Sequence, residues 1–167
     1  MKQLNHRRVM VLVMAFLPWI VVKQTATVFA QNQSADANMQ ILRDKVKADK
    51  KLLVAANMDL NDEEGKKFWP LYEAYQKELG QENHRLGKAI MEYADAYAKG
   101  PIPDDLAKKL MTEVLSIEQA EVKLKSSYAD KIGKVLSAAK TARYMQIETK
   151  IRSALKYELA KQIPLVD

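Results

Sequence analysis

Apolar residues recur along this chain at steps of three, four and seven, the spacing that places side chains on one face of a helix. The first such region, residues 37–57, predicts an amphipathic helix packed on the rest of the protein. Its apolar positions are Met39, Leu42, Val46 and Leu53. Its other face is basic and carries Arg43, Lys45, Lys47, Lys50 and Lys51. That face is either simply solvated or a strip that attracts client proteins or lipid head groups.

A second, longer helix is predicted from Asp62 to about Lys99. Pro70 lies inside it and has no N–H to donate to the Lys66 carbonyl, so we expect a kink there. The apolar stripe of this helix is close to a heptad repeat. It consists of Phe68, Tyr72, Tyr75, Leu79, Leu86, Ala89 or Ile90, Tyr93 and Tyr97.

A glycine followed by two prolines, within Gly100–Pro103, ends the second helix. The third helix is predicted to begin at Pro103, because proline and the acids Asp104 and Asp105 suit a first helical turn. Its stripe is Leu106, Leu110, Val114, Ile117, Leu124, Tyr128 and Ile132 or Val135. Since the connection is so short, the second and third helices should form an antiparallel hairpin.

A fourth helix is predicted to follow Ser137 and to run to about Lys161. Its inward positions should be Tyr144, Ile147, Ile151, Leu155 and Leu159. The apolar tail after it contains Pro164, which keeps it out of the helix, and it either docks back on the domain or promotes association. No stretch of useful length alternates apolar and polar residues, so the patterns predict an all-α fold of four helices built on a hairpin.

Two of these helix starts share a local pattern in which a leucine precedes a capping residue. Leu60 is followed by Asn61, whose side chain can cap free backbone N–H groups, and Glu64 stands where a capping box requires Glu or Gln. Leu136 is followed in the same way by Ser137. There, the residue in the position of Glu64 is a lysine, Lys140, which cannot accept a hydrogen bond, so that capping box should be one-sided.

The first thirty residues resemble a secretory signal peptide and should not contribute to the fold. Three basic residues precede an apolar run of 14 residues, Val9–Val22, which is shorter than the roughly 20 needed to span a bilayer. Ala30 is a small residue that a signal peptidase accepts. We therefore expect a cleavable signal at residues 1–30 and a single domain at residues 31–167 that begins with Gln31. An uncleaved membrane anchor is the alternative.

Cleavage would change the charge argument. The whole chain has a net charge of +6, with 27 basic and 21 acidic residues. Four of the basic residues and none of the acidic ones precede Gln31, which leaves a net charge of only +2, and no nucleic-acid partner is expected. The remaining charge is uneven: residues 59–121 carry a net −6 and residues 122–161 a net +7. These opposite charges favour pairing of the helices within one chain or across an antiparallel dimer.

The residue content gives little support for catalysis, a metal or a cofactor. The chain has no cysteine, and after cleavage it has one histidine, His84, whose neighbours Glu82 and Asp95 form no tight ligand set. No serine has the surroundings of a nucleophile and no glycine-rich loop precedes a helix. We expect a binding protein and not an enzyme, although a metal site shared across a dimer is left open.

The two helix starts also suggest a family. Leu60–Glu64 and Leu136–Lys140 resemble degenerate copies of the paired Leu-Thr-x-x-Gln motif of the Spy/CpxP-like periplasmic proteins. The run Leu136–Arg152 is similar to the second motif and the helix that follows it, and Phe68–Tyr72 is similar to a segment of some members. The resemblance extends over about Met39–Leu159. In this chain Asn and Ser replace the threonines, and Glu and Lys replace the glutamines, which puts a direct role of the glutamines in doubt.

The resemblance implies an elongated, cradle-shaped helical protein of the periplasm, often an antiparallel homodimer. Members act as ATP-independent chaperones, as restraints on envelope-stress sensor kinases, or as metal-responsive proteins. We therefore expect this chain to bind unfolded or misfolded envelope proteins. The alternatives are the periplasmic domain of a sensor kinase as the partner, or a helical scaffold that binds no client.

Candidate residues for client binding come from the aromatic and basic side chains. The apolar candidates are Phe68, Trp69, Tyr72 and Tyr75, and the basic candidates, which would attract acidic segments, are Arg143, Lys150 and Arg152. The alternative for the aromatic residues is that they fill the helix seams as core, with the tyrosine hydroxyls reaching water.

Overall fold

The structure is a computed structural model that describes residues 48–166. The expected signal segment, its Ala30–Gln31 cleavage site and the first part of the predicted first helix, with Met39, Leu42 and Val46, lie outside these residues.

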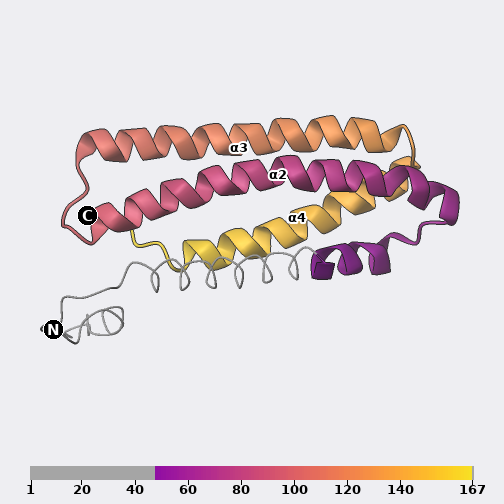
Figure 1. The fold of residues 1–167 in the computed structure, drawn as a ribbon, viewed down its shortest axis with the longest axis horizontal. Helices are drawn as coiled ribbons and strands as arrows, with labels where there is room; N and C mark the ends of the chain where they lie inside the picture. The colour runs from indigo at the N-terminus through magenta and orange to yellow at the C-terminus, as the bar shows by residue number, and fades with distance from the viewer. Residues whose placement is uncertain (1–47, 167) are drawn as a thin grey trace, which may run out of the picture. The chain divides into compact units, whose positions relative to one another are not determined.

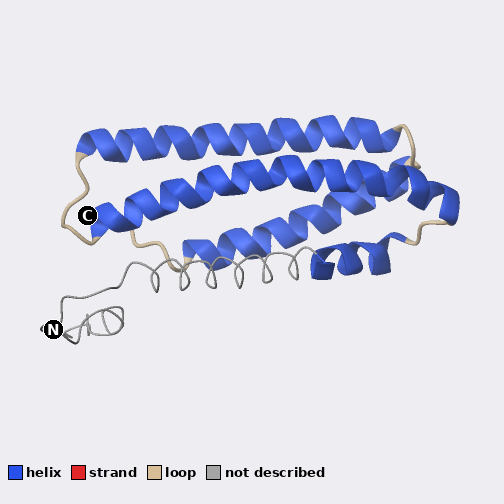
Figure 2. Cartoon of the chain, viewed as in Figure 1, coloured by secondary structure: helices blue, strands red, loops and turns tan. Residues whose placement is uncertain are grey.

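The described part of the chain consists of helices and loops and contains no strand (Figure 2), which confirms the all-α class. A helical segment at residues 48–58 precedes α2 (Asp62–Tyr97), α3 (Asp104–Gly133) and α4 (Ala138–Ala160). α2 and α3 lie side by side as the predicted hairpin, and α4 begins where α3 ends and runs back along the pair (Figure 1). We call the end of the bundle near the α3–α4 turn the core end, and the end near the α2–α3 turn the distal end.

Local side-chain chemistry fixes where the helices begin. At α2 the Asn61 side chain accepts a hydrogen bond from the Glu64 backbone N–H at 2.9 Å, and the Glu64 carboxylate accepts one from the Asn61 N–H at 3.0 Å. This confirms the capping box. At α4 the Ser137 hydroxyl accepts from the Lys140 N–H at 3.3 Å, and no return bond forms because a lysine side chain has no acceptor.

Proline and glycine residues shape α2. The helix continues through Pro70, and its first turns lie at an angle to the rest (Figure 1), as expected where one backbone hydrogen bond is missing. After its end, Gly100 adopts a φ of 136°, a conformation that side chains with a Cβ rarely take. Pro103 then precedes the first residue of α3 with the extended backbone expected of an N-cap.

The hydrophobic core is concentrated at the core end, where segment 48–58, the starts of α2 and α4 and the end of α3 meet. It contains Val54, Met58, Phe68, Tyr72, Tyr75, Leu79, Tyr128, Ile132, Leu136 and Tyr144. No Cα atom of α4 comes within 8 Å of one of α2. Large rings therefore fill the space between these two helices, and we call Phe68, Tyr72, Tyr75 and Tyr144 the aromatic layer.

Four positions expected in the apolar stripes are exposed instead. Tyr97, at the last position of the α2 stripe, is 38% exposed. In the first helix Leu53 is exposed, and Val54 and Met58 are buried instead. In α4 the inward stripe ends early, because Leu155 and Leu159 are 51% and 40% exposed. Several apolar residues are adjacent at residues 52–54, so composition alone did not determine which of them faces inward.

We predict that Phe68→Ala destabilises the protein by about 3–5 kcal/mol, because it deletes a fully buried ring from the centre of the aromatic layer and leaves a cavity. Urea unfolding followed by circular dichroism measures the change. Tyr157→Ala is the matched control, since this ring on α4 is largely exposed, and it should change the free energy of unfolding by less than about 0.5 kcal/mol. Equal effects of the two substitutions would contradict the position of the core.

Candidate functional site

The aromatic residues proposed from the sequence to bind clients are, for the most part, core. Phe68, Tyr72 and Tyr75 have at most 3% of their surface exposed, so they are not available to a partner in this structure. The ring of Phe68 packs edge-on against Tyr144, with 5.1 Å between ring centroids. Trp69 is half-buried, and the Lys51 ammonium lies 5.2 Å from the centre of its ring. The prediction that Phe68, Tyr72 and Tyr75 form an exposed surface for client binding is therefore corrected. The alternative, that they pack in the core, holds for these three residues.

The tyrosines of this core remain protonated at ordinary pH. Burial, followed by the nearby charge of Glu148, raises the pKa of Tyr144, Tyr72 and Tyr75. Burial and a hydrogen bond to Glu78 raise the pKa of Tyr128 to about 12. These hydroxyls therefore act as neutral hydrogen-bonding groups at the edge of an apolar layer.

A buried carboxylate lies next to the aromatic layer. Glu148 of α4 is 2% exposed, and it accepts hydrogen bonds from the Lys50 ammonium at 2.5 Å and from the Gln76 amide at 3.3 Å. A charge this deeply buried is tolerated only when it is paired and hydrogen-bonded. Lys50, which was expected on an outward basic face, therefore points inward and joins segment 48–58 to α4.

The basic candidates separate into one that is engaged and two that are exposed. Arg152 forms an ion pair with Glu121, and the Arg152 Nε donates a hydrogen bond to the Glu121 Oε2 at 3.3 Å. The Arg152 Nη1 donates a second hydrogen bond to the Asn83 Oδ1 at 2.5 Å. Burial lowers the pKa of Arg152. Its proposed role in attracting acidic segments is therefore corrected. Arg143 and Lys150 are exposed on α4.

A second lysine extends the contact of Arg152. The Lys156 ammonium lies 3.5 Å from a Glu118 oxygen and 3.2 Å from a Glu121 oxygen. We call Arg152, Lys156, Glu118 and Glu121 the ionic clasp. It joins the second half of α4 to α3 and confirms that the opposite charges of the two chain regions pair within one chain.

The two leucine-containing helix starts meet in space. The Lys140 ammonium lies 2.5 Å from a Glu64 carboxylate oxygen and donates to the Asp59 carbonyl at 2.8 Å. Leu136 is buried in the core, and Leu60 is half-buried against it. Glu64 and Lys140, which occupy equivalent positions in the two helix starts, thus form an ion pair. Sequence reasoning missed it, although their opposite charges at equivalent positions were the available signal.

Most of the exposed large apolar side chains lie toward the distal end. They include Met91, Tyr97, Met111, Leu115, Leu155, Leu159, Ile163, Leu165 and Val166. Leu115 precedes Glu118 by three residues and Leu159 follows Lys156 by three, so each lies about one helical turn closer to the distal end than its neighbour in the ionic clasp. We call Met91, Leu115, Leu155 and Leu159 the distal face.

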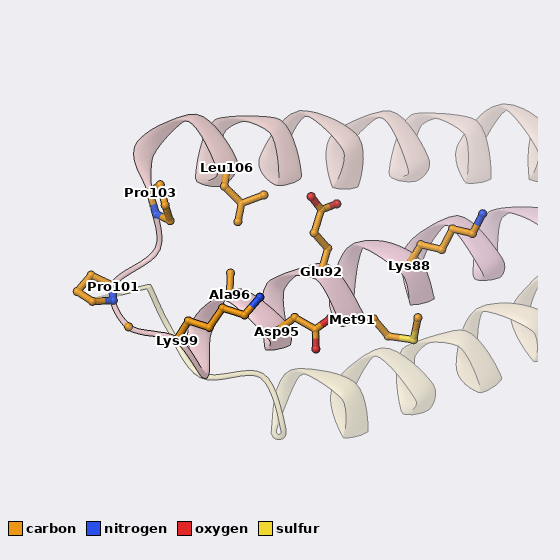
Figure 3. A pocket seen from close by; sticks show the side chains of 10 residues that line it. Lys88, Met91, Glu92, Asp95, Ala96, Lys99, Pro101, Pro103 and Leu106 are labelled. Carbon is orange, nitrogen blue, oxygen red and sulfur yellow. The ribbon is translucent and has the colours of Figure 1, made fainter. Parts of the chain in front are cut away.

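Two open hollows of about 600 and 630 Å³ lie along α2 and α3 near their connecting turn. Met91 and Leu106 contribute apolar surface to the first hollow, and Lys88 and Lys99 contribute basic groups. Figure 3 shows the Met91 side chain directed from α2 toward α4. This end of the bundle therefore combines accessible apolar surface with exposed cationic side chains.

The described part of the chain shows no arrangement for metal binding. Over residues 48–166, no three His, Cys, Asp or Glu side chains lie together in a way that could hold an ion. His84 is exposed on α2, and Glu82 forms an ion pair with Arg85 at 2.8 Å. None of the helices in these residues is long and apolar enough to span a bilayer.

The Glu64–Lys140 contact predicts a specific pH dependence. The hydrogen bond from Lys140, followed by that from the Asn61 N–H, lowers the pKa of Glu64 below its ordinary value of 4.5. The carboxylate therefore contributes stability above that value and loses it as the pH falls through the lower pKa of the folded state. Glu64→Gln should lower the urea midpoint at pH 7, and the gap from the unmodified chain should be smaller at an acidic pH below 4.5.

Glu63→Gln is the control for this experiment, because Glu63 forms only an exposed ion pair with Lys66 on the same helix. It should shift the midpoint little at either pH. A gap for Glu64→Gln that is equally large at both pH values would show that the ion pair is not its cause.

None of the protein-family models, curated proteins or solved structures compared with this chain matches it.

Proposed function

We propose that this protein is a periplasmic, ATP-independent, chaperone-like binding protein that shields apolar segments of unfolded or misfolded envelope proteins. The distal face is the observation that carries the proposal. The N-terminal pattern of basic residues, apolar run and small residue supports the periplasm, and the motif resemblance supports the kind of client.

The composition of the distal face suits clients of varied sequence. Leu159 and Leu155 are exposed at a spacing of one helical turn, and Met91 adds an unbranched, polarizable side chain that adapts to different neighbours. Exposed apolar side chains that gather near one end of a small domain are typical of a surface that contacts another protein. Flexible side chains of this kind allow many partners to bind with moderate affinity.

The driving force in this proposal is the burial of apolar surface, at roughly 25 cal/mol per Å². Such binding is reversible and needs no nucleotide hydrolysis. Lys88 and Lys99 lie beside the apolar surface, where they would keep the complex soluble and favour segments that carry acidic residues near apolar ones.

We predict that the chain beginning at Gln31 suppresses the aggregation of a denatured client at near-stoichiometric ratio. The variant Met91→Ser, Leu115→Ser, Leu159→Ser should need about fivefold more protein for equal suppression, because it removes three exposed apolar contacts. Light scattering of the client with increasing amounts of each protein measures the effect.

Leu52→Ser is the matched control, since Leu52 is an exposed leucine on segment 48–58, away from the distal face. It should suppress aggregation as the unmodified chain does. If the unmodified chain fails over a wide range of ratios, or if both variants lose activity equally, the proposal is wrong.

A further inference from the structure

The second half of α4 and the tail, residues 152–166, make polar contacts with the bundle and contribute no buried side chain to it. We call these residues the flap. No residue of the flap is buried. Its polar contacts with α2 and α3 include the ionic clasp, the hydrogen bond from Arg152 to Asn83, and a hydrogen bond from the Tyr93 hydroxyl to the Pro164 carbonyl at 3.0 Å.

The first half of α4 is anchored differently. Tyr144 is fully buried in the aromatic layer, Glu148 is buried against Lys50, and Lys140 is paired with Glu64. Burial along α4 therefore ends just before the flap begins. Segments with few buried apolar groups open before the rest of a protein does.

The α2–α3 surface under the flap has an apolar centre and an acidic edge. Asn83 and Tyr93 of α2 contact the flap, and Leu86 and Ile90 lie between them at helical spacing on the same side of α2, where both are half-buried. The acidic edge is the α3 side of the ionic clasp.

We propose that the flap is a displaceable occupant of this surface, and that the surface binds an amphipathic partner segment with apolar residues at helical spacing and basic residues beside them. The segment would take the positions of Leu155, Leu159, Arg152 and Lys156. This inference rests on the proposed function and adds a second mode of binding to it. Basic amphipathic segments displace the flap and bind beneath it, whereas other clients contact the exposed side chains of the distal face with the flap in place.

Charge complementarity selects the basic partner. When the flap lifts, Glu118 and Glu121 lose the cations that pair with them, and a basic segment replaces these contacts whereas an acidic one is repelled. When the flap opens, the charged groups of the ionic clasp become hydrated again. Because an ion pair is only slightly more stable than its separate hydrated ions, the clasp does not prevent the flap from opening.

The absence of cysteine allows a direct test in the full chain. The double variant Glu118→Cys, Lys156→Cys can be joined by a short bismaleimide cross-linker that ties the flap to α3. The control variant Glu92→Cys, Lys109→Cys replaces an exposed ion pair between α2 and α3 and leaves the flap free. The probe is a fluorescent peptide with the sequence of residues 150–166, and each variant is compared before and after cross-linking.

Cross-linking at 118 and 156 should weaken peptide binding at least about tenfold, because the flap then stays in place, and cross-linking at 92 and 109 should leave it unchanged. A peptide carrying Arg152→Glu and Lys156→Glu should bind the unlinked proteins at least about tenfold more weakly. Peptide binding that is equal in linked and unlinked protein, or that is absent from both, overturns the proposal.

Hydrogen exchange separates this inference from the proposed function, because it needs no client. Amides of residues 153–160 should exchange at least about a hundredfold faster than core amides of α2 and α3, and the 118–156 cross-link should slow them. If the amides of α2, α3 and α4 all exchange at the same rate, the flap does not open separately and the proposal is contradicted. A chain that fails to suppress aggregation, but shows cross-link-sensitive exchange and peptide binding, refutes the proposed function alone.

Discussion

The edge-on packing of Phe68 against Tyr144 is the contact on which the rest of the described structure depends. The backbones of α2 and α4 stay more than 8 Å apart at their Cα atoms, so the apolar contact between them is made by large rings. Tyr72 and Tyr75 complete the layer, with ring centroids 6.2 and 6.3 Å from that of Tyr144. Aromatic pairs at such distances contribute beyond the area that they bury. With α4 held in this way, Glu148 is placed where Lys50 and Gln76 can neutralise and bind it.

The aromatic layer also explains why the two ends of the bundle differ. Rings are concentrated in the first turns of α2, and segment 48–58 covers them with Val54 and Met58. Toward the distal end, the side chains that reach from α4 to its neighbours are charged, and the leucines of α4 remain exposed. A small helical domain can in this way keep one end stable and offer the other to a partner.

Much of the fold could be predicted because the local signals are strong. The capping residues and the proline–glycine turn place the helix ends within about two residues of those observed, and a short connection leaves few alternatives to an antiparallel hairpin. The direction in which individual side chains point was harder to predict from the sequence than the helix ends were. Leu53 and Val54 are adjacent and equally apolar, so periodicity alone did not determine which of them is buried.

The candidate site was predicted less well than the fold, for a physical reason. Phe68 and Tyr72 fit the sequence pattern of a core and that of an aromatic binding surface. The positions of α4 and of segment 48–58, which cover these rings, distinguish the two. Arg152 looked like a free cation because its partner Glu121 is 31 residues away in the sequence. The Glu64–Lys140 pair spans 76 residues and depends on the same packing.

Site-specific photo-cross-linking tests most directly the claim that the core end is structural and the distal end makes the contacts. A photoreactive phenylalanine analogue would replace Met111 near the distal end in one protein and Leu52 on segment 48–58 in another, and each would be irradiated with an unfolded client. Both positions are exposed, so reactivity alone does not bias the result. The account predicts client adducts at position 111 and few at position 52. Adducts at 52 with none at 111 would contradict it.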